Sequence, residues 1–172
     1  MARRVSLGFA LSIFLSSLAP AATVDPPSDS DTPKEPAVTH RAAGTFDVTL
    51  TPQTPADGAE APSWGRMAIA KTFHGDLEAT SRGEMLTAMT EVKGSAGYVA
   101  VEKVDGTLGG RRGSFFLQHS GLMDRGSPSL VITVVPDSGN GELAGIEGTM
   151  TIEITEGKHF YAFEYRLRDV AP

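Results

Sequence analysis

The sequence contains no cysteine in its 172 residues. A disulfide framework, a thiolate metal site and a cysteine nucleophile are therefore excluded. Basic residues are also few, with 15 Lys and Arg against 21 Asp and Glu and a formal net charge of −6. Nucleic acids and anionic membrane surfaces both attract clustered Lys and Arg, so we expect neither as a partner of this chain.

Histidine is scarce as well, with four copies at positions 40, 74, 119 and 159. No two of them share the close spacing that places ligands on one face of a strand or helix, so we expect no metal site. The Gly-x-Ser-x-Gly turn of serine hydrolases is absent, and the glycines at 139 and 141 lack the lysine of a phosphate-binding loop. The sequence therefore predicts no cofactor.

Long apolar runs are missing, apart from one near the N-terminus. Residues 5–18 form an apolar run of 14 residues that follows Arg3 and Arg4 and ends in small residues. A bilayer span takes about 20 residues, so the run indicates an export signal over residues 1–22 and no membrane anchor in the mature form. We expect a periplasmic or secreted protein. Residues 23–43 are rich in Pro and Asp and are predicted to be a disordered linker.

From Gly44 onward the sequence alternates apolar and polar residues with period two, which is typical of half-buried strands. Residues 85–91 either extend a strand or form a short helical piece. Residues 130–135 are apolar almost throughout, which predicts burial on both faces. Glycines 109, 110 and 113 predict a tight turn with positive φ. The predicted strands are residues 44–51, 64–73, 76–84, 98–105, 114–120, 130–135, 143–154 and 159–167.

Short connections between successive strands imply antiparallel neighbours. Eight such strands can close into an up-and-down barrel, which removes both edges of the sheet. We therefore predict an all-β domain over residues 44–168, an eight-stranded antiparallel barrel, with a two-sheet sandwich as the alternative. At eight strands the interior is either filled by side chains or holds one small ligand.

Six segments stand out as motifs: residues 44–48 (GTFDV), 71–77 (KTFHGDL), 97–103 (GYVAVEK), 106–121 (GTLGGRRGSFFLQHSG), 135–145 (VPDSGNGELAG) and the aromatic last strand. In this order they resemble a bacterial family of unknown function, the domain-of-unknown-function 3224 family. The resemblance implies a barrel similar to that of allene oxide cyclase. The family has no assigned activity, so the resemblance implies a fold and not a reaction.

The strand over residues 114–120 places Phe115, Leu117 and His119 on one face. If that face lines the barrel, His119 is a polar group in an apolar interior that could bind a ligand or act as an acid or base. The alternative is a core histidine whose ring is satisfied by a neighbouring strand.

Two further charged residues lie on faces that can point inward. Glu102 shares its face with Tyr98, and an inward Glu102 would either have a raised pKa or pair with Lys71. Because Val99 and Val101 compete for the interior, Glu102 can also face solvent. A buried Lys71 could have a lowered pKa and react. Alternatively, its stem lies along apolar surface while its ammonium reaches water.

The last strand carries Tyr161 and Tyr165 on one face with His159. This face could form the wall of a ligand site or part of a packed core. The sequence supports three functions: an exported barrel that binds a small hydrophobic molecule, a cyclase or isomerase acting on a lipid-like or polyketide-like substrate, and a structural protein with a filled barrel. Whether the chain forms a homo-oligomer stays open.

Overall fold

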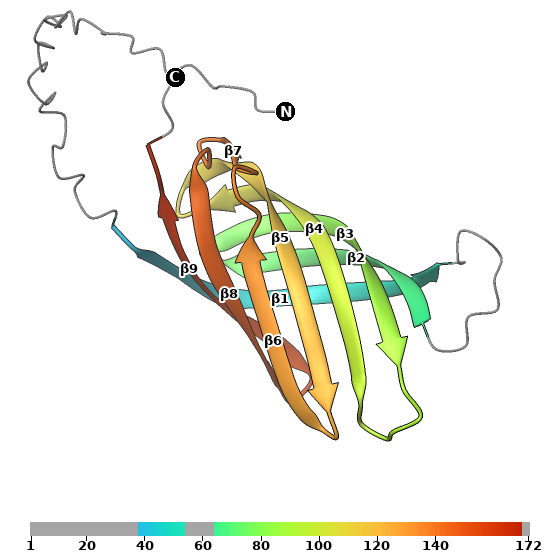
Figure 1. Ribbon diagram of the computed structural model, residues 1–172. Coiled ribbons are helices and arrows are strands. Elements are labelled where there is room, and N and C mark those ends of the chain that lie inside the picture. Colours follow the sequence, from blue (N-terminus) through green and yellow to red (C-terminus); the bar gives the residue numbers. More distant parts are fainter. Residues whose placement is uncertain (1–37, 54–63, 170–172) are drawn as a thin grey trace, which may run out of the picture. The chain divides into compact units, whose positions relative to one another are not determined.

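The computed structural model describes residues 38–53 and 64–169, which form β-strands and connecting turns (Figure 1). These residues contain no helix, and hence no helix that could span a membrane. The predicted export signal and residues 23–37 of the predicted linker lie outside the described residues. The strands are β1 His40–Gln53, β2 Trp64–Gly75, β3 Leu77–Met89, β4 Ala96–Leu108, β5 Arg111–Asp124, β6 Ser127–Val134, β7 Asn140–Gly141, β8 Ile146–Thr155 and β9 Lys158–Leu167.

Eight of the strands close into an antiparallel barrel in the order β1-β2-β3-β4-β5-β6-β8-β9, with β9 paired to β1 and the short β7 added to β5. The predicted barrel is confirmed and the sandwich is not found. Following paired inward residues once around the barrel leads from Pro52 back to Ala42, ten residues along β1. The corresponding stagger is eight in a (β/α)8 barrel, so these strands tilt more steeply and enclose a wider interior.

Three local details refine or correct the sequence prediction. β1 begins at His40, ahead of the predicted domain start, and Ala42 is already buried. The ambiguous segment after Glu84 is a strand that continues to Met89. Gly109 and Gly110 have the positive φ expected for the β4–β5 turn, but Gly113 does not. Gly113 lies opposite Gly141, and a Cβ there would come within 2.1 Å of the carbonyl oxygen of Asn140. The glycine therefore permits a close approach of β7 and is not part of the turn.

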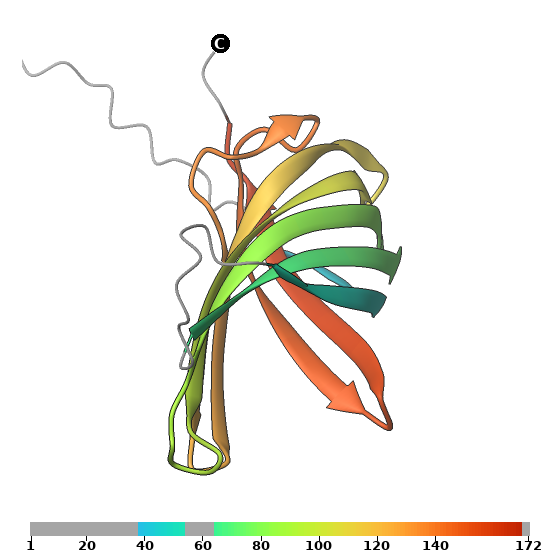
Figure 2. The ribbon, with the colours of Figure 1, turned by 90° about the vertical axis from the view of Figure 1, so that its right-hand side faces the viewer.

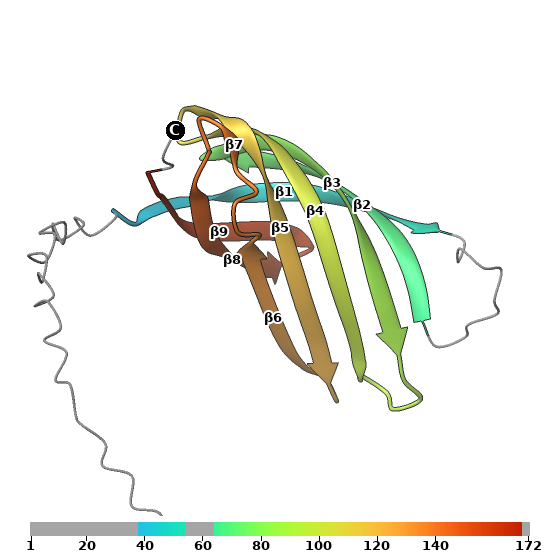
Figure 3. The same cartoon turned by 45° about the horizontal axis from the view of Figure 1, so that its top comes forward.

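One end of the barrel, which we call the closed end, is covered by the connection between β6 and β8. The connection carries β7 and then Leu143, which is buried. Figures 1 and 3 show it beside the β4–β5 turn. The start of the predicted strand over residues 143–154 is thus a turn, and β8 begins at Ile146. A continuous apolar core fills this half: Ala42, Phe46, Phe73, Leu77, Ala79, Val104, Leu108, Phe115, Leu117, Ile132, Val134, Leu143, Ile146, Met150, Tyr161, Phe163 and Tyr165.

The opposite end, which we call the mouth, is less well covered. Inward-facing apolar side chains remain exposed there, by 45% at Leu50, 40% at Leu130 and 64% at Ile154. Figure 2 shows the β5–β6 and β8–β9 hairpins pointing away from each other at this end. The divergence follows from the ladder between β6 and β8, which consists of two residue pairs, whereas β8 and β9 share ten.

The prediction that residues 130–135 are buried on both faces is wrong. Ile132 and Val134 point into the barrel and are buried, but Val131 points outward and is 57% exposed. A barrel is a single layer of sheet, so its outer face has nothing packed against it unless a helix or loop covers it. An apolar run in such a strand therefore does not imply a second covering layer.

Candidate functional site

Four polar side chains from four successive strands meet inside the barrel. Glu102 on β4 is fully buried, and its Oε1 accepts hydrogen bonds from Nζ of Lys71 on β2 at 2.6 Å and from Nε2 of His119 on β5 at 2.8 Å. Its Oε2 accepts a hydrogen bond from Oγ of Ser81 on β3 at 2.5 Å. We call Lys71, Ser81, Glu102 and His119 the polar cluster. It brings together three residues singled out from the sequence and adds Ser81.

The register of the strands explains why these side chains converge. Lys71 lies directly opposite Ser81, and Glu102 lies opposite Gly83. A Cβ at Gly83 would come within 2.6 Å of the Cβ of Glu102 and 2.2 Å of a backbone oxygen. Only glycine fits there, because β3 and β4 approach each other closely beside the carboxylate. The inward direction of Glu102 also places Val99 and Val101 on the outer face, where both are exposed.

The polar cluster holds Glu102 in its ionised form. Burial by itself would raise the pKa of this carboxyl group. The hydrogen bond from His119, the positive charge and hydrogen bond of Lys71 and the hydrogen bond from Ser81 outweigh burial and lower the pKa of Glu102 to about 2. Of the two arrangements considered from the sequence, pairing with Lys71 is therefore found and a raised pKa is not. The side chain of Lys71 is 6% exposed and its ammonium is paired with Glu102, so it is not the solvated ammonium considered from the sequence.

Tyr98 lies next to the polar cluster on the side of the mouth. Its partner across the β4–β5 ladder is Gly121, and the ring covers that glycine so closely that a Cβ there would lie 2.1 Å from Cε1 of Tyr98. Burial and the negative charge of Glu102 raise the pKa of the Tyr98 hydroxyl. The hydroxyl is therefore protonated at neutral pH and can donate a hydrogen bond.

The other four residues singled out from the sequence lie in the apolar core. Phe115, Leu117, Tyr161 and Tyr165 are all buried, and the Tyr161 hydroxyl accepts a hydrogen bond of 2.9 Å from the backbone N–H of Leu77. This hydrogen bond satisfies a buried amide at the closed end. The structure thus separates the candidates into a packed group and a group of four, Lys71, Tyr98, Glu102 and His119, nearer the mouth.

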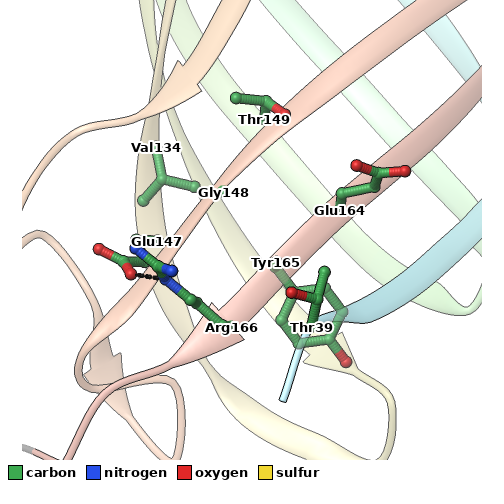
Figure 4. A pocket seen from close by; sticks show the side chains of 8 residues that line it. All are labelled: Thr39, Val134, Glu147, Gly148, Thr149, Glu164, Tyr165 and Arg166. Carbon is green, nitrogen blue, oxygen red and sulfur yellow. Dashed lines mark hydrogen bonds and ion pairs between the residues drawn. The ribbon is translucent and has the colours of Figure 1, made fainter. Parts of the chain in front are cut away.

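Two hollows are present, and neither is lined by a residue of the polar cluster. One has a volume of about 390 Å³ and lies where Val134 and Gly148 separate beyond the short β6–β8 ladder (Figure 4). Glu147 at its edge forms ion pairs with Arg166 and Arg168. The other, of about 450 Å³, lies over β2, β3 and β4 and includes His74 and Arg112. Within residues 38–53 and 64–169, no group of three or more His, Asp and Glu could hold a metal ion.

The low pKa of Glu102 predicts an acid-dependent loss of stability. The folded-state pKa of about 2 lies below the ordinary value of 4.5, so the stabilisation is complete above about pH 4.5 and is lost as the pH falls through 2. The difference corresponds to about 3 kcal/mol. Urea unfolding between pH 6 and pH 2 is expected to show the stability gap between the wild-type protein and Glu102→Gln shrinking by about that amount. A gap that does not change with pH would contradict the ionised state of Glu102.

Comparison with known proteins agrees with this architecture. Residues 42–165 match the model of the family described as protein of unknown function (DUF3224). A crystal structure of a DUF3224 protein of unknown function from Shewanella oneidensis is 52% identical, with a TM-score of 0.72, and the match covers 77% of this chain and 100% of that one. No curated protein matches the sequence. The family match spans most of the sequence, including the whole polar cluster, and the chain therefore belongs to the DUF3224 family.

Proposed function

We propose that the barrel binds a small, mainly apolar molecule in its mouth, with the polar cluster and Tyr98 at the inner end of the site. The observation that carries the proposal is the exposure of inward-facing apolar side chains, above all Leu50, Leu130 and Ile154. Apolar surface that lines a concave site is stabilised when a ligand removes it from water. A filled structural barrel would bury these side chains as thoroughly as the core at the closed end.

The chemistry of the polar cluster favours binding over catalysis. Both oxygens of Glu102 already accept hydrogen bonds, and a carboxylate with a pKa of about 2 is a weak base. The amine of Lys71 is held as an ion pair with Glu102 and is a poor nucleophile in that state. A substrate could exchange a proton with either group only by breaking the hydrogen bonds that hold the polar cluster together.

The test compares two neighbouring residues of β6 that face opposite ways. Leu130→Ser removes an apolar contact from the mouth, whereas Val131→Ser changes a similarly exposed residue on the outer face. We expect Leu130→Ser to weaken binding of the neutral fluorescent probe N-phenyl-1-naphthylamine about five-fold, equivalent to ~1 kcal/mol of lost apolar contact. Val131→Ser should bind like the wild-type protein. Equal losses in both variants, or no binding by the wild-type protein, would argue against a site in the mouth.

We also propose that the protein works outside the cytoplasm, on the strength of the apolar run after Arg3 and Arg4. N-terminal sequencing of the protein recovered from its own host is expected to begin at Thr23. Recovery of an intact N-terminus from the cytoplasmic fraction would contradict the proposal.

A further inference from the structure

We infer that the ligand of the mouth presents a hydrogen-bond donor to Nδ1 of His119, so that the site selects neutral alcohols or phenols over hydrocarbons and carboxylates. The inference rests on the proposed function. It identifies the polar end of a molecule whose greater part contacts the apolar mouth.

The imidazole proton of His119 lies on Nε2. Glu102 is ionised and accepts the hydrogen bond from Nε2 of His119, so Nε2 carries a proton. The tautomer is assigned from this partner. In a neutral ring, Nδ1 then has a free lone pair and can only accept a hydrogen bond.

The surroundings of the His119 ring do not balance a further positive charge. The one carboxylate of the polar cluster is already balanced by the ammonium of Lys71 at 2.6 Å. The residues directly across from His119 on the neighbouring strands are Ala100 and Ile132, which carry no charge. An imidazolium would therefore add a second, unbalanced positive charge to a buried site, which is strongly unfavourable.

Nδ1 of His119 is the ring atom left to accept a hydrogen bond from a ligand. Among the described residues, no hydrogen bond reaches this atom, although the His119 side chain is 96% buried. No fully buried polar side-chain atom of these residues lacks a partner, which fits an Nδ1 at the small exposed part of the ring. His119 points into the barrel, and the next inward position towards the mouth is Gly121, which has no side chain and is covered by the ring of Tyr98. A ligand that extends from the mouth to His119 would therefore pass beside Tyr98.

The experiment uses three probes of one shape, namely naphthalene, 2-naphthol and 2-naphthoate, as competitors of N-phenyl-1-naphthylamine at pH 7. We expect 2-naphthol to bind about ten-fold more tightly than either of the others, because it alone combines a donor with no charge. In His119→Phe, which keeps an aromatic ring but has no acceptor, 2-naphthol and naphthalene should bind equally. Nitrogen-15 NMR of the wild-type ring should show Nδ1 unprotonated and its signal shifting when 2-naphthol is added.

The outcomes separate the two proposals. If naphthalene competes as well as 2-naphthol, the mouth binds apolar molecules but the inference about His119 is wrong. Tightest binding of 2-naphthoate, or a protonated Nδ1 in the NMR spectrum, would mean that the ring is cationic and would also overturn the inference. If none of the three competes and N-phenyl-1-naphthylamine itself does not bind, the proposed function fails and the inference fails with it.

Discussion

Replacing Glu102 by glutamine is expected to destabilise the barrel by about 3–5 kcal/mol. The substitution keeps the size of the side chain but removes the negative charge that balances Lys71, whose Nζ lies 2.6 Å from Oε1. The ammonium would then be buried without a counter-ion, next to the faces of Phe46 and Phe73 at 5.0 and 5.8 Å. Cation–π contacts offset only part of that cost. Urea unfolding followed by far-UV circular dichroism at pH 7 measures the change.

The control for this prediction also removes the positive charge of Lys71, which has no counter-ion in Glu102→Gln. Lys71→Met has a similar length and no charge, so the double variant Lys71→Met/Glu102→Gln should recover most of the stability lost in Glu102→Gln. The coupling between the two positions, obtained from a double-mutant cycle, is then large and favourable. Additive losses from the two single substitutions would show that the ion pair contributes nothing beyond the size of its side chains.

Replacing Phe163 by alanine is expected to cost about 3–5 kcal/mol, through lost burial and a cavity in the core. Phe163 is 0% exposed and its ring stacks on Phe115 at 5.7 Å and on Tyr165 at 5.3 Å between centroids. It lies at the closed end, where the core is continuous, so neighbouring strands have little freedom to collapse into the space.

The matched control for Phe163 is on the same strand. Phe160 points outward and is 40% exposed, so Phe160→Ala should cost less than about 1 kcal/mol. Both variants can be compared by chemical denaturation with unchanged pH and salt. A loss at Phe160 equal to that at Phe163 would mean that the outer face is covered by something in solution, since an exposed ring contributes little.

The sequence was sufficient to predict the barrel because its alternation is strong and its connections are short. It could not place Glu102, since Val99 and Val101 form an equally plausible inner face on the same strand. That choice is decided by other strands: Lys71 and His119 supply partners, and Gly83 provides the space beside the carboxylate. Pairing register across strands is not readable from one strand alone.

Other parts of the site gave weaker signals. Ser81 sits at an inward position of a strand with many small polar residues, and nothing in its local sequence distinguishes it. The role of Gly121 depends on a tyrosine that is distant in sequence and becomes its neighbour through pairing of β4 and β5. Residues 143–145 were predicted as strand but belong to a turn. Leu143 and Ile146 are buried as an apolar strand would require, but Leu143 covers the closed end.

The two-pair ladder between β6 and β8 has a mechanical consequence. Every other pair of neighbouring strands in the barrel shares seven or more residue pairs. Separation of β6 from β8 therefore costs less free energy than separation of any other strand pair. Separation of β6 from β8 would make both of them edge strands of an open, curved sheet, while the other strand pairs stay intact. The amide protons that pair β6 with β8 would then exchange with solvent before those of any other strand pair. Transient opening at this join would let water reach the interior of the barrel.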